Sequence, residues 1–231
     1  MSSPRRKHSL SDLFGQLLFV TLILSVIYSF VRIIIPRPLM QNGSEFAHER
    51  GDYVLMFIQC LLGLVVFSLP SIVSRKWKFS IPNFIYVMYY IFLYCAIFLG
   101  EVLQFYYLVP HWDTILHFFS GAMLGALGFI LVSWLTDSEK ISDSLSPAFV
   151  ALFAFCFALS CGAIWEIYEY VFDGLLGLNM QKFVTAEGVT LIGHEALRDT
   201  MKDIIVDALA ALLISVMGYA RMKADRSSYS K

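Results

Sequence analysis

Charged residues are scarce in this sequence, and those present nearly cancel. Asp, Glu, Lys and Arg make up 15% of the 231 residues, against about 25% in an average soluble domain, and the formal net charge is −1. Such a balance creates no global field that would attract nucleic acid, so no nucleic-acid partner is predicted. Because hydrophobic residues reach 58%, a soluble fold would struggle to bury its apolar surface.

Cysteine is also used little, and a signal-peptide cleavage site is lacking. The four cysteines fall inside apolar runs, where a thiol acts as a small hydrophobic side chain, and their spacing fits neither a disulfide framework nor a zinc site. They are Cys60, Cys95, Cys156 and Cys161. The first apolar run is too long for a signal-peptide core and no A-x-A site follows it, so we expect it to remain as a span.

Long apolar runs are what the sequence does contain. Runs of about 20 apolar residues match the ~30 Å hydrocarbon layer that a transmembrane helix has to cross. The predicted fold class is therefore all-α, a polytopic membrane bundle of about six transmembrane helices. The spans are predicted near residues 13–35, 53–73, 82–107, 113–135, 147–170 and 199–220. No soluble segment is left over, so residues 1–231 are predicted to form a single integral membrane domain.

Lys and Arg are divided unevenly between the two sides of this six-span arrangement. Eleven lie on the side of the two termini, whereas five lie on the other side, with Arg32 near the end of the first span. Because cytoplasmic loops carry the excess of these residues, both termini are predicted to be cytoplasmic. The longest connection, residues 172–198, then lies outside, and a loop of this length could cover a site.

Acidic residues and one histidine converge at one predicted depth. At about 1.5 Å of rise per residue, Glu101, His117 and Glu166 lie about 28–30 Å from the cytoplasmic ends of their helices. Asp203 opens the sixth span, and Asp207 lies one turn deeper. Ionisable groups at such depth cost roughly 2.5–3.5 kcal/mol each, so they normally face the bundle interior and mark a site.

The spacing of these residues strengthens the prediction, because residues three or four positions apart share a helix face. The predicted catalytic residues are Asp113, His117, Glu166, Asp203 and Asp207. The predicted ligands of a divalent metal ion are Asp113, His117, Glu166, Glu169, Asp199 and Asp203. A plainer interpretation stays open for Glu101, Glu169 and Asp199. They could lie among lipid headgroups, cap helices or pair with Arg198, Lys202 or His194. Three small residues below His117, namely Gly121, Gly125 and Gly128, favour close helix packing and would also leave room beneath the cluster.

Three segments resemble the YjdF-like family of bacterial inner-membrane proteins, whose patterns are D-x-x-x-H-F, W-E-x-x-E and D-T-x-x-D-M. They are His111–Phe118, Ile164–Glu169 and Arg198–Asp207, with Ile204 in place of the final methionine. The sequence is similar, more distantly, to VanZ-like membrane proteins, which are linked to the bacterial envelope and the glycopeptide response. The resemblance implies a bacterial inner-membrane location and a site among these motifs, but no reaction.

Three functions stay open at this point, and the sequence does not decide whether the protein is an enzyme. The first is a metal-assisted enzyme that acts on a lipid headgroup or envelope precursor at the outer face. Its weakness is the lack of a second histidine with ligand spacing, for which His194 is the one candidate. The second is a proton- or cation-coupled carrier or lipid-handling protein that uses Asp207 and Glu166. The third is a structural or regulatory membrane protein whose polar cluster fixes helix packing. Membrane lipids are the expected partners, and the oligomeric state stays open.

Overall fold

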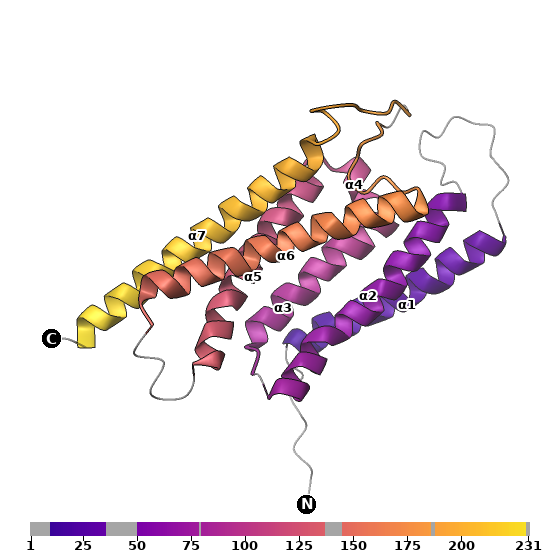
Figure 1. Ribbon diagram of the computed structural model, residues 1–231. Coiled ribbons are helices and arrows are strands. Elements are labelled where there is room, and N and C mark those ends of the chain that lie inside the picture. The colour runs from indigo at the N-terminus through magenta and orange to yellow at the C-terminus, as the bar shows by residue number, and fades with distance from the viewer. Residues whose placement is uncertain (1–9, 36–49, 79, 137–144, 186–187, 230–231) are drawn as a thin grey trace, which may run out of the picture. The chain divides into compact units, whose positions relative to one another are not determined.

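The protein is all-helical, as predicted. The computed structural model describes residues 10–35, 50–78, 80–136, 145–185 and 188–229 (Figure 1). Within this part of the chain the only β pairing is an isolated antiparallel bridge between Val184 and Thr190. The chain divides into two compact units, Met1–Trp112 and Asp113–Lys231. That residues 1–231 form a single domain stays a prediction.

Six helices are long and apolar enough to cross a membrane, which confirms the number and order of the predicted spans. They cover Leu10–Ile34, Tyr53–Trp77, Asn83–Val102, Trp112–Leu135, Pro147–Leu176 and Arg198–Ser228. Many large apolar side chains on these helices are exposed, for example Leu24 and Leu152 at 60% each. Apolar surface on this scale suits contact with lipid and not with water.

The first unit is built around α1 (Leu10–Ile34), α2 (Arg50–Trp77) and α3 (Asn83–Leu93). Leu18 and Leu22 of α1 are fully buried and pack against a core that includes Cys60 and Tyr90. Cys60 thus acts as a small hydrophobic residue, as its place in an apolar run indicated. Pro70 lies inside α2 and leaves the carbonyl of Val66 without its usual helical donor.

The third span ends earlier than the predicted limit near residue 107. A π-helix, η1 (Tyr94–Val102), continues α3, and a separate short helix, α4 (Phe105–Leu108), follows after Gln104, whose φ is 59°. Gly100 lets the ring of Tyr106 on α4 pack against η1, because a Cβ at position 100 would lie 2.9 Å from Cζ of Tyr106. An apolar run alone does not reveal a helix end that depends on an aromatic ring packed against a glycine.

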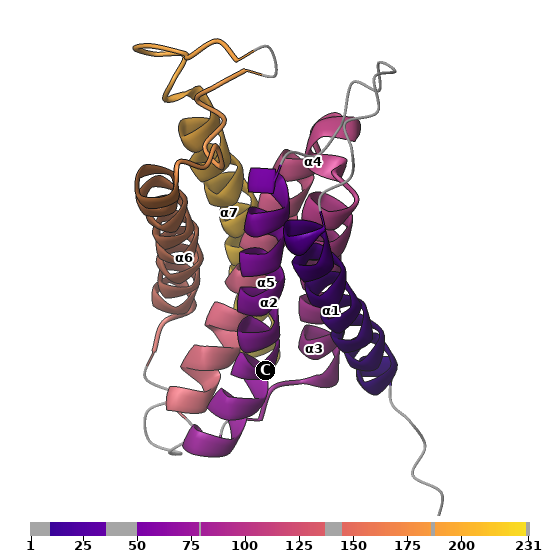
Figure 2. The ribbon, with the colours of Figure 1, turned by 90° about the vertical axis from the view of Figure 1, so that its right-hand side faces the viewer.

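The second unit consists of three long helices, α5 (Trp112–Leu135), α6 (Pro147–Leu176) and α7 (Arg198–Tyr229). The side chain of Ser146 accepts a hydrogen bond from Phe149 N at 3.2 Å and begins α6, and Gly177 ends it with a φ of 66°. The start of α5, the end of α6 and the start of α7 lie at the same end of this unit (Figures 1 and 2). The loop between α6 and α7 lies at that end too.

Glycines on α5 bring the three helices close together. A Cβ on Gly121 would lie 3.1 Å from Cα of Asp207 on α7, and one on Gly128 would lie 2.7 Å from Cα of Ala154 on α6. A Cβ on Gly125 would likewise lie 3.3 Å from Cβ of Ile214 on α7. These residues confirm the close helix packing expected of them, but the neighbouring helices fill the space that was expected beneath the polar cluster.

Candidate functional site

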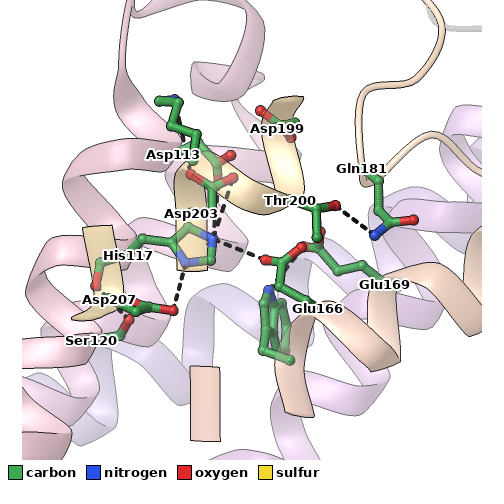
Figure 3. A network of polar contacts seen from close by, with 12 residues as sticks. Asp113, His117, Ser120, Glu166, Glu169, Gln181, Asp199, Thr200, Asp203 and Asp207 are labelled. Atoms are coloured by element: carbon green, nitrogen blue, oxygen red, sulfur yellow. Dashed lines mark hydrogen bonds and ion pairs between the residues drawn. The ribbon is translucent and has the colours of Figure 1, made fainter. Parts of the chain in front are cut away.

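The imidazole of His117 on α5 lies among carboxylates from all three helices of the second unit. Its Nε2 atom lies 3.8 Å from Asp113 Oδ1, one turn earlier on α5, and 3.8 Å from Glu166 Oε1 on α6. Asp203 Oδ2 on α7 lies 4.0 Å from the same nitrogen. Figure 3 shows these side chains pointing toward one another. Residues far apart in the sequence therefore meet at one ring nitrogen.

The other ring nitrogen has a different partner. His117 Nδ1 lies 3.3 Å from Oδ2 of Asp207, on the side of the ring opposite the first group (Figure 3). When Nδ1 carries the proton and donates it to this carboxylate, Nε2 keeps a lone pair for a ligand. Metal-binding histidines are commonly oriented by a carboxylate in this manner.

The cluster is deeply buried and its hydrogen bonding is incomplete. Asp203 and Asp207 are each 2% exposed and Glu166 is 4% exposed. Both carboxylate oxygens of Glu166, with Asp203 Oδ1 and Asp207 Oδ1, have no hydrogen-bond partner among the described residues. Buried carboxylate oxygens that accept no hydrogen bond are costly, so these oxygens call for protons or a cation.

Lys182, from the loop between α6 and α7, provides positive charge at the edge of the cluster. Its ammonium forms an ion pair with Asp113 and lies 3.2 Å from Asp199 Oδ2. Burial lowers the pKa of this ammonium, but the attraction of Asp113 and Asp199 outweighs burial, so the pKa lies above its ordinary value. Lys182 therefore stays charged at neutral pH and covers one oxygen of Asp113.

The loop reaches the cluster because hydrogen bonds to α6 and α7 fold it back. Asp173, near the end of α6, accepts bonds from the backbone N–H groups of Met180 at 2.8 Å and Gln181 at 3.0 Å. The Gln181 side chain then donates to Thr200 Oγ1 on α7 at 2.7 Å. These bonds hold Lys182 between α5 and α7. The expectation that this loop could cover a site is thus consistent with the fold of residues 177–185.

Asp207 has room at the cluster because glycines face it from two sides. A Cβ on Gly162 of α6 would overlap Asp207 Oδ2 and lie 2.9 Å from its Cγ. Gly121 of α5 lies against the backbone of Asp207, as described above. Gly162 was not singled out from the sequence, although it lies four residues before Glu166, on the same helix face.

The remaining predicted site residues lie at the edge of the cluster or away from it. Glu169 is half-buried, and its Oε1 accepts a hydrogen bond from Trp165 Nε1 at 2.9 Å. Asp199 pairs with Lys182, and Lys202 Nζ lies 3.9 Å from Asp203 Oδ1. His194 is exposed on the loop. In the first unit, Glu101 accepts a hydrogen bond from Gln59 Nε2 at 3.1 Å, a partner that was not expected from the sequence.

Asp113, His117 and Asp203 could hold a metal ion. One ligand atom from each lies within 4.8 Å of the others. Two atoms bound to one ion at about 2.1–2.4 Å lie at most about 4.2–4.8 Å apart, so small side-chain adjustments would bring all three to bonding distance. Asp203 Oδ1 accepts no hydrogen bond from the described residues, which supports this fit.

Comparisons with known proteins identify the chain as a membrane protein but indicate no reaction. Residues 16–224 match the family described as predicted membrane protein (DUF2238). An uncharacterized protein of Thermotoga maritima is 29% identical over 124 residues, which are 53% of this chain and 55% of that protein. The chain thus spans about half the length of this relative. No solved structure matches the chain.

Proposed function

The chain belongs to the DUF2238 family of predicted membrane proteins, and we propose that this multi-pass membrane protein is a metal-dependent enzyme of the membrane surface. The observation that carries the proposal is the group around His117 Nε2, where three carboxylates from three helices lie at 3.8–4.0 Å. A single imidazole nitrogen among buried carboxylates is a donor set for a divalent cation.

The charge balance of the cluster supports a bound cation. Six carboxylates gather at this end of the second unit. Among the described residues, the cations that contact them are two lysines and, when protonated, His117. The carboxylates are Asp113, Glu166, Glu169, Asp199, Asp203 and Asp207, and the lysines are Lys182 and Lys202. A divalent ion would offset the remaining negative charge and would bind the oxygens that lack hydrogen bonds.

The residues divide into different roles under this proposal. His117 Nε2, Asp113 Oδ1 and Asp203 Oδ2 hold the ion, and Asp207 orients the imidazole through Nδ1. A divalent metal supplies a Lewis acid that lowers the pKa of bound water. Glu166 serves as the general base for that water, because its carboxylate faces His117 and both of its oxygens lack hydrogen-bond partners among the described residues.

The position of the cluster favours a substrate at the membrane surface. Asp113 lies in the first turn of α5 and Asp199 in the first turn of α7, so the site opens at the ends of the spans. A lipid headgroup or an envelope precursor is the substrate class that reaches this level. The excess of Lys and Arg near the termini would put this end at the outer leaflet of a bacterial inner membrane, in keeping with the YjdF-like resemblance.

A carrier that moves protons or cations is the second candidate, and the buried carboxylates favour it. Transport requires a path across the rest of the bilayer as well. Below Asp207, however, Ala210 and Ala211 are fully buried, and Gly121 and Gly125 bring α5 into contact with this part of α7. Tight apolar packing at this depth makes the enzyme the better supported function.

Metal content tests the proposal directly. Detergent-purified wild type, Asp113→Ala, Asp203→Ala and the double variant would be loaded with divalent metals, washed and analysed by mass spectrometry. We expect about one ion per wild-type chain and weaker metal binding in each single variant. The effects of the two substitutions on metal affinity should be non-additive, because both carboxylates bind one ion. Glu195→Gln is the control, since Glu195 is exposed and pairs with Arg198. A wild type without metal affinity would refute the proposal.

A general base acting on bound water implies that the reaction is hydrolysis, and this part of the proposal needs its own test. Metal-loaded wild type and Glu166→Gln would be incubated with vesicles of bacterial lipids, and the products would be identified by mass spectrometry. We expect Glu166→Gln to bind metal but to lose product formation by about 10²–10⁴-fold, the usual contribution of a general base. Equal product formation by both proteins would contradict the role given to Glu166.

A further inference from the structure

Arg32 of α1 carries a charge that no described residue neutralises. It lies in the last turn of α1 and is half-buried. Its Nε atom is buried and has no hydrogen-bond partner, and no carboxylate among the described residues pairs with the guanidinium. A guanidinium has five N–H donors and stays ionised, so partial burial without an acceptor is costly. An acceptor from outside the described residues is therefore expected.

The ring of Tyr53 holds the guanidinium in place. Arg32 Cζ lies 5.2 Å from the centroid of this ring, which belongs to a buried residue of the neighbouring helix α2. Tyr28, one turn before Arg32, meets the same ring edge-on, with centroids 6.1 Å apart. The face of an aromatic ring attracts a cation but supplies no oxygen to the N–H groups. Arg32 is thus positioned by aromatic contacts and still needs an acceptor.

Arg32 lies at the level where a bilayer presents phosphate groups. At 1.5 Å per residue it is about 33 Å from Leu10 at the start of α1, just beyond the ~30 Å hydrocarbon layer. Tyr53 opens the next candidate span, so the pair lies at one end of the first unit. Val31 and Ile34, on either side of Arg32 in the sequence, are 44% and 61% exposed, as suits contact with lipid. At this depth the acceptor that a lipid offers is its phosphate ester.

We propose that Arg32, held against Tyr53, binds the phosphate group of one phospholipid. A phosphodiester has two free oxygens that match the planar fork of a guanidinium, so the pair is bidentate. The acyl chains of the same lipid lie along the exposed apolar side chains of α1, among them Leu24 and Ile27. The site therefore selects for the phosphate and not for the alcohol attached to it.

Native mass spectrometry of the full-length protein in a mild detergent tests this assignment. We expect one phosphatidylglycerol per chain, retained about tenfold more strongly than diacylglycerol with the same acyl chains, because diacylglycerol lacks the phosphate. Inorganic phosphate in excess should not displace the lipid, since it has no acyl chains to lie on α1. Displacement would show a site for free anions, and equal retention of diacylglycerol would show contact with acyl chains only. Either result would overturn the proposal.

Arg32→Gln tests the guanidinium itself. It should lower retention of phosphatidylglycerol about tenfold, and the melting temperature without lipid should stay the same or rise, because an unpaired charge has been removed. Arg32→Lys keeps the charge but loses the planar fork, so its retention should lie between the two. The matched control is Arg75→Gln, which removes an exposed arginine from the last turn of α2. Wild-type retention by Arg32→Gln, or an equal loss with Arg75→Gln, would show that Arg32 is not the site.

An acid of the chain is the competing acceptor. The side chains of three acidic residues that follow α1, namely Glu45, Glu49 and Asp52, lie outside the described part of the structure. A variant with Glu45→Gln, Glu49→Gln and Asp52→Asn should retain phosphatidylglycerol as wild type does. A clear gain in retention would show that one of these acids occupies Arg32 in the wild-type protein, and the lipid assignment would then be wrong.

Discussion

His117 Nδ1 on α5 lies 3.3 Å from Asp207 Oδ2 on α7, although the two residues are 90 positions apart in the sequence. This contact determines which ring nitrogen of His117 is free to bind a ligand. With Nδ1–H donated to Asp207, the lone pair of Nε2 points to the side of Asp113, Glu166 and Asp203. The relationship gives Asp207 an orienting role, distinct from that of the proposed ligands.

Asp207→Asn tests that orienting role. Asparagine is nearly isosteric and its carbonyl can still accept from Nδ1, but the negative charge that strengthens the imidazole as a ligand is lost. We expect metal affinity to fall about 10- to 100-fold, the usual cost of losing such a partner. Thermal stability without metal should stay the same or rise, because a buried charge has been removed. Calorimetric metal titration and melting curves in detergent measure the two effects, and unchanged affinity would exclude Asp207 from the site.

Gly162→Ala tests whether the glycine on α6 makes room for Asp207. The new methyl group would overlap Asp207 Oδ2, so the aspartate has to move away from His117. We expect a loss of about 1–3 kcal/mol in stability, typical of overpacking, together with weaker metal binding.

Gly174→Ala is the matched control for this variant. Gly174 lies on the same helix, and a Cβ there would meet no atom within 4 Å. Alanine has the higher helix propensity, so this change should leave metal affinity unchanged and stability equal or slightly higher. Similar behaviour of the two variants would show that Gly162 has no specific relation to Asp207.

Lys182→Gln tests the loop lysine. Its ammonium neutralises Asp113 and Asp199, so the metal-free protein should melt at a lower temperature without it. Metal affinity should rise about fivefold, as expected from an ion pair of about 1 kcal/mol that competes with the metal for Asp113. Arg198→Gln is the control, because Arg198 is exposed and pairs with Glu195. Weaker metal binding by Lys182→Gln would instead indicate that the lysine holds the ligands in place.

The residues of the site could be predicted from the sequence better than the contacts between them. The spacing of Asp113 and His117, and of Asp203 and Asp207, already indicates two shared helix faces, and these pairs meet in the second unit. Which carboxylate faces which ring nitrogen depends on helix rotation and on close approach at Gly162, and no spacing rule gives either. Lys182 escaped notice because it lies outside every span. Its reach depends on two backbone bonds to Asp173, which only the folded loop reveals.

The orientation of the protein in the membrane is the last prediction, and it decides which compartment the cluster faces. The distribution of Lys and Arg predicts cytoplasmic termini and an external loop between α6 and α7. On a background without the four native cysteines, a cysteine at Ile192 should react with a membrane-impermeant maleimide added to intact cells, since this side chain is 83% exposed. A cysteine at Lys140, which lies outside the described residues, should react only after the membrane is opened. The opposite pattern would put the cluster on the cytoplasmic face, where the proposed substrate could not be an external envelope precursor, although the metal site itself would be unaffected.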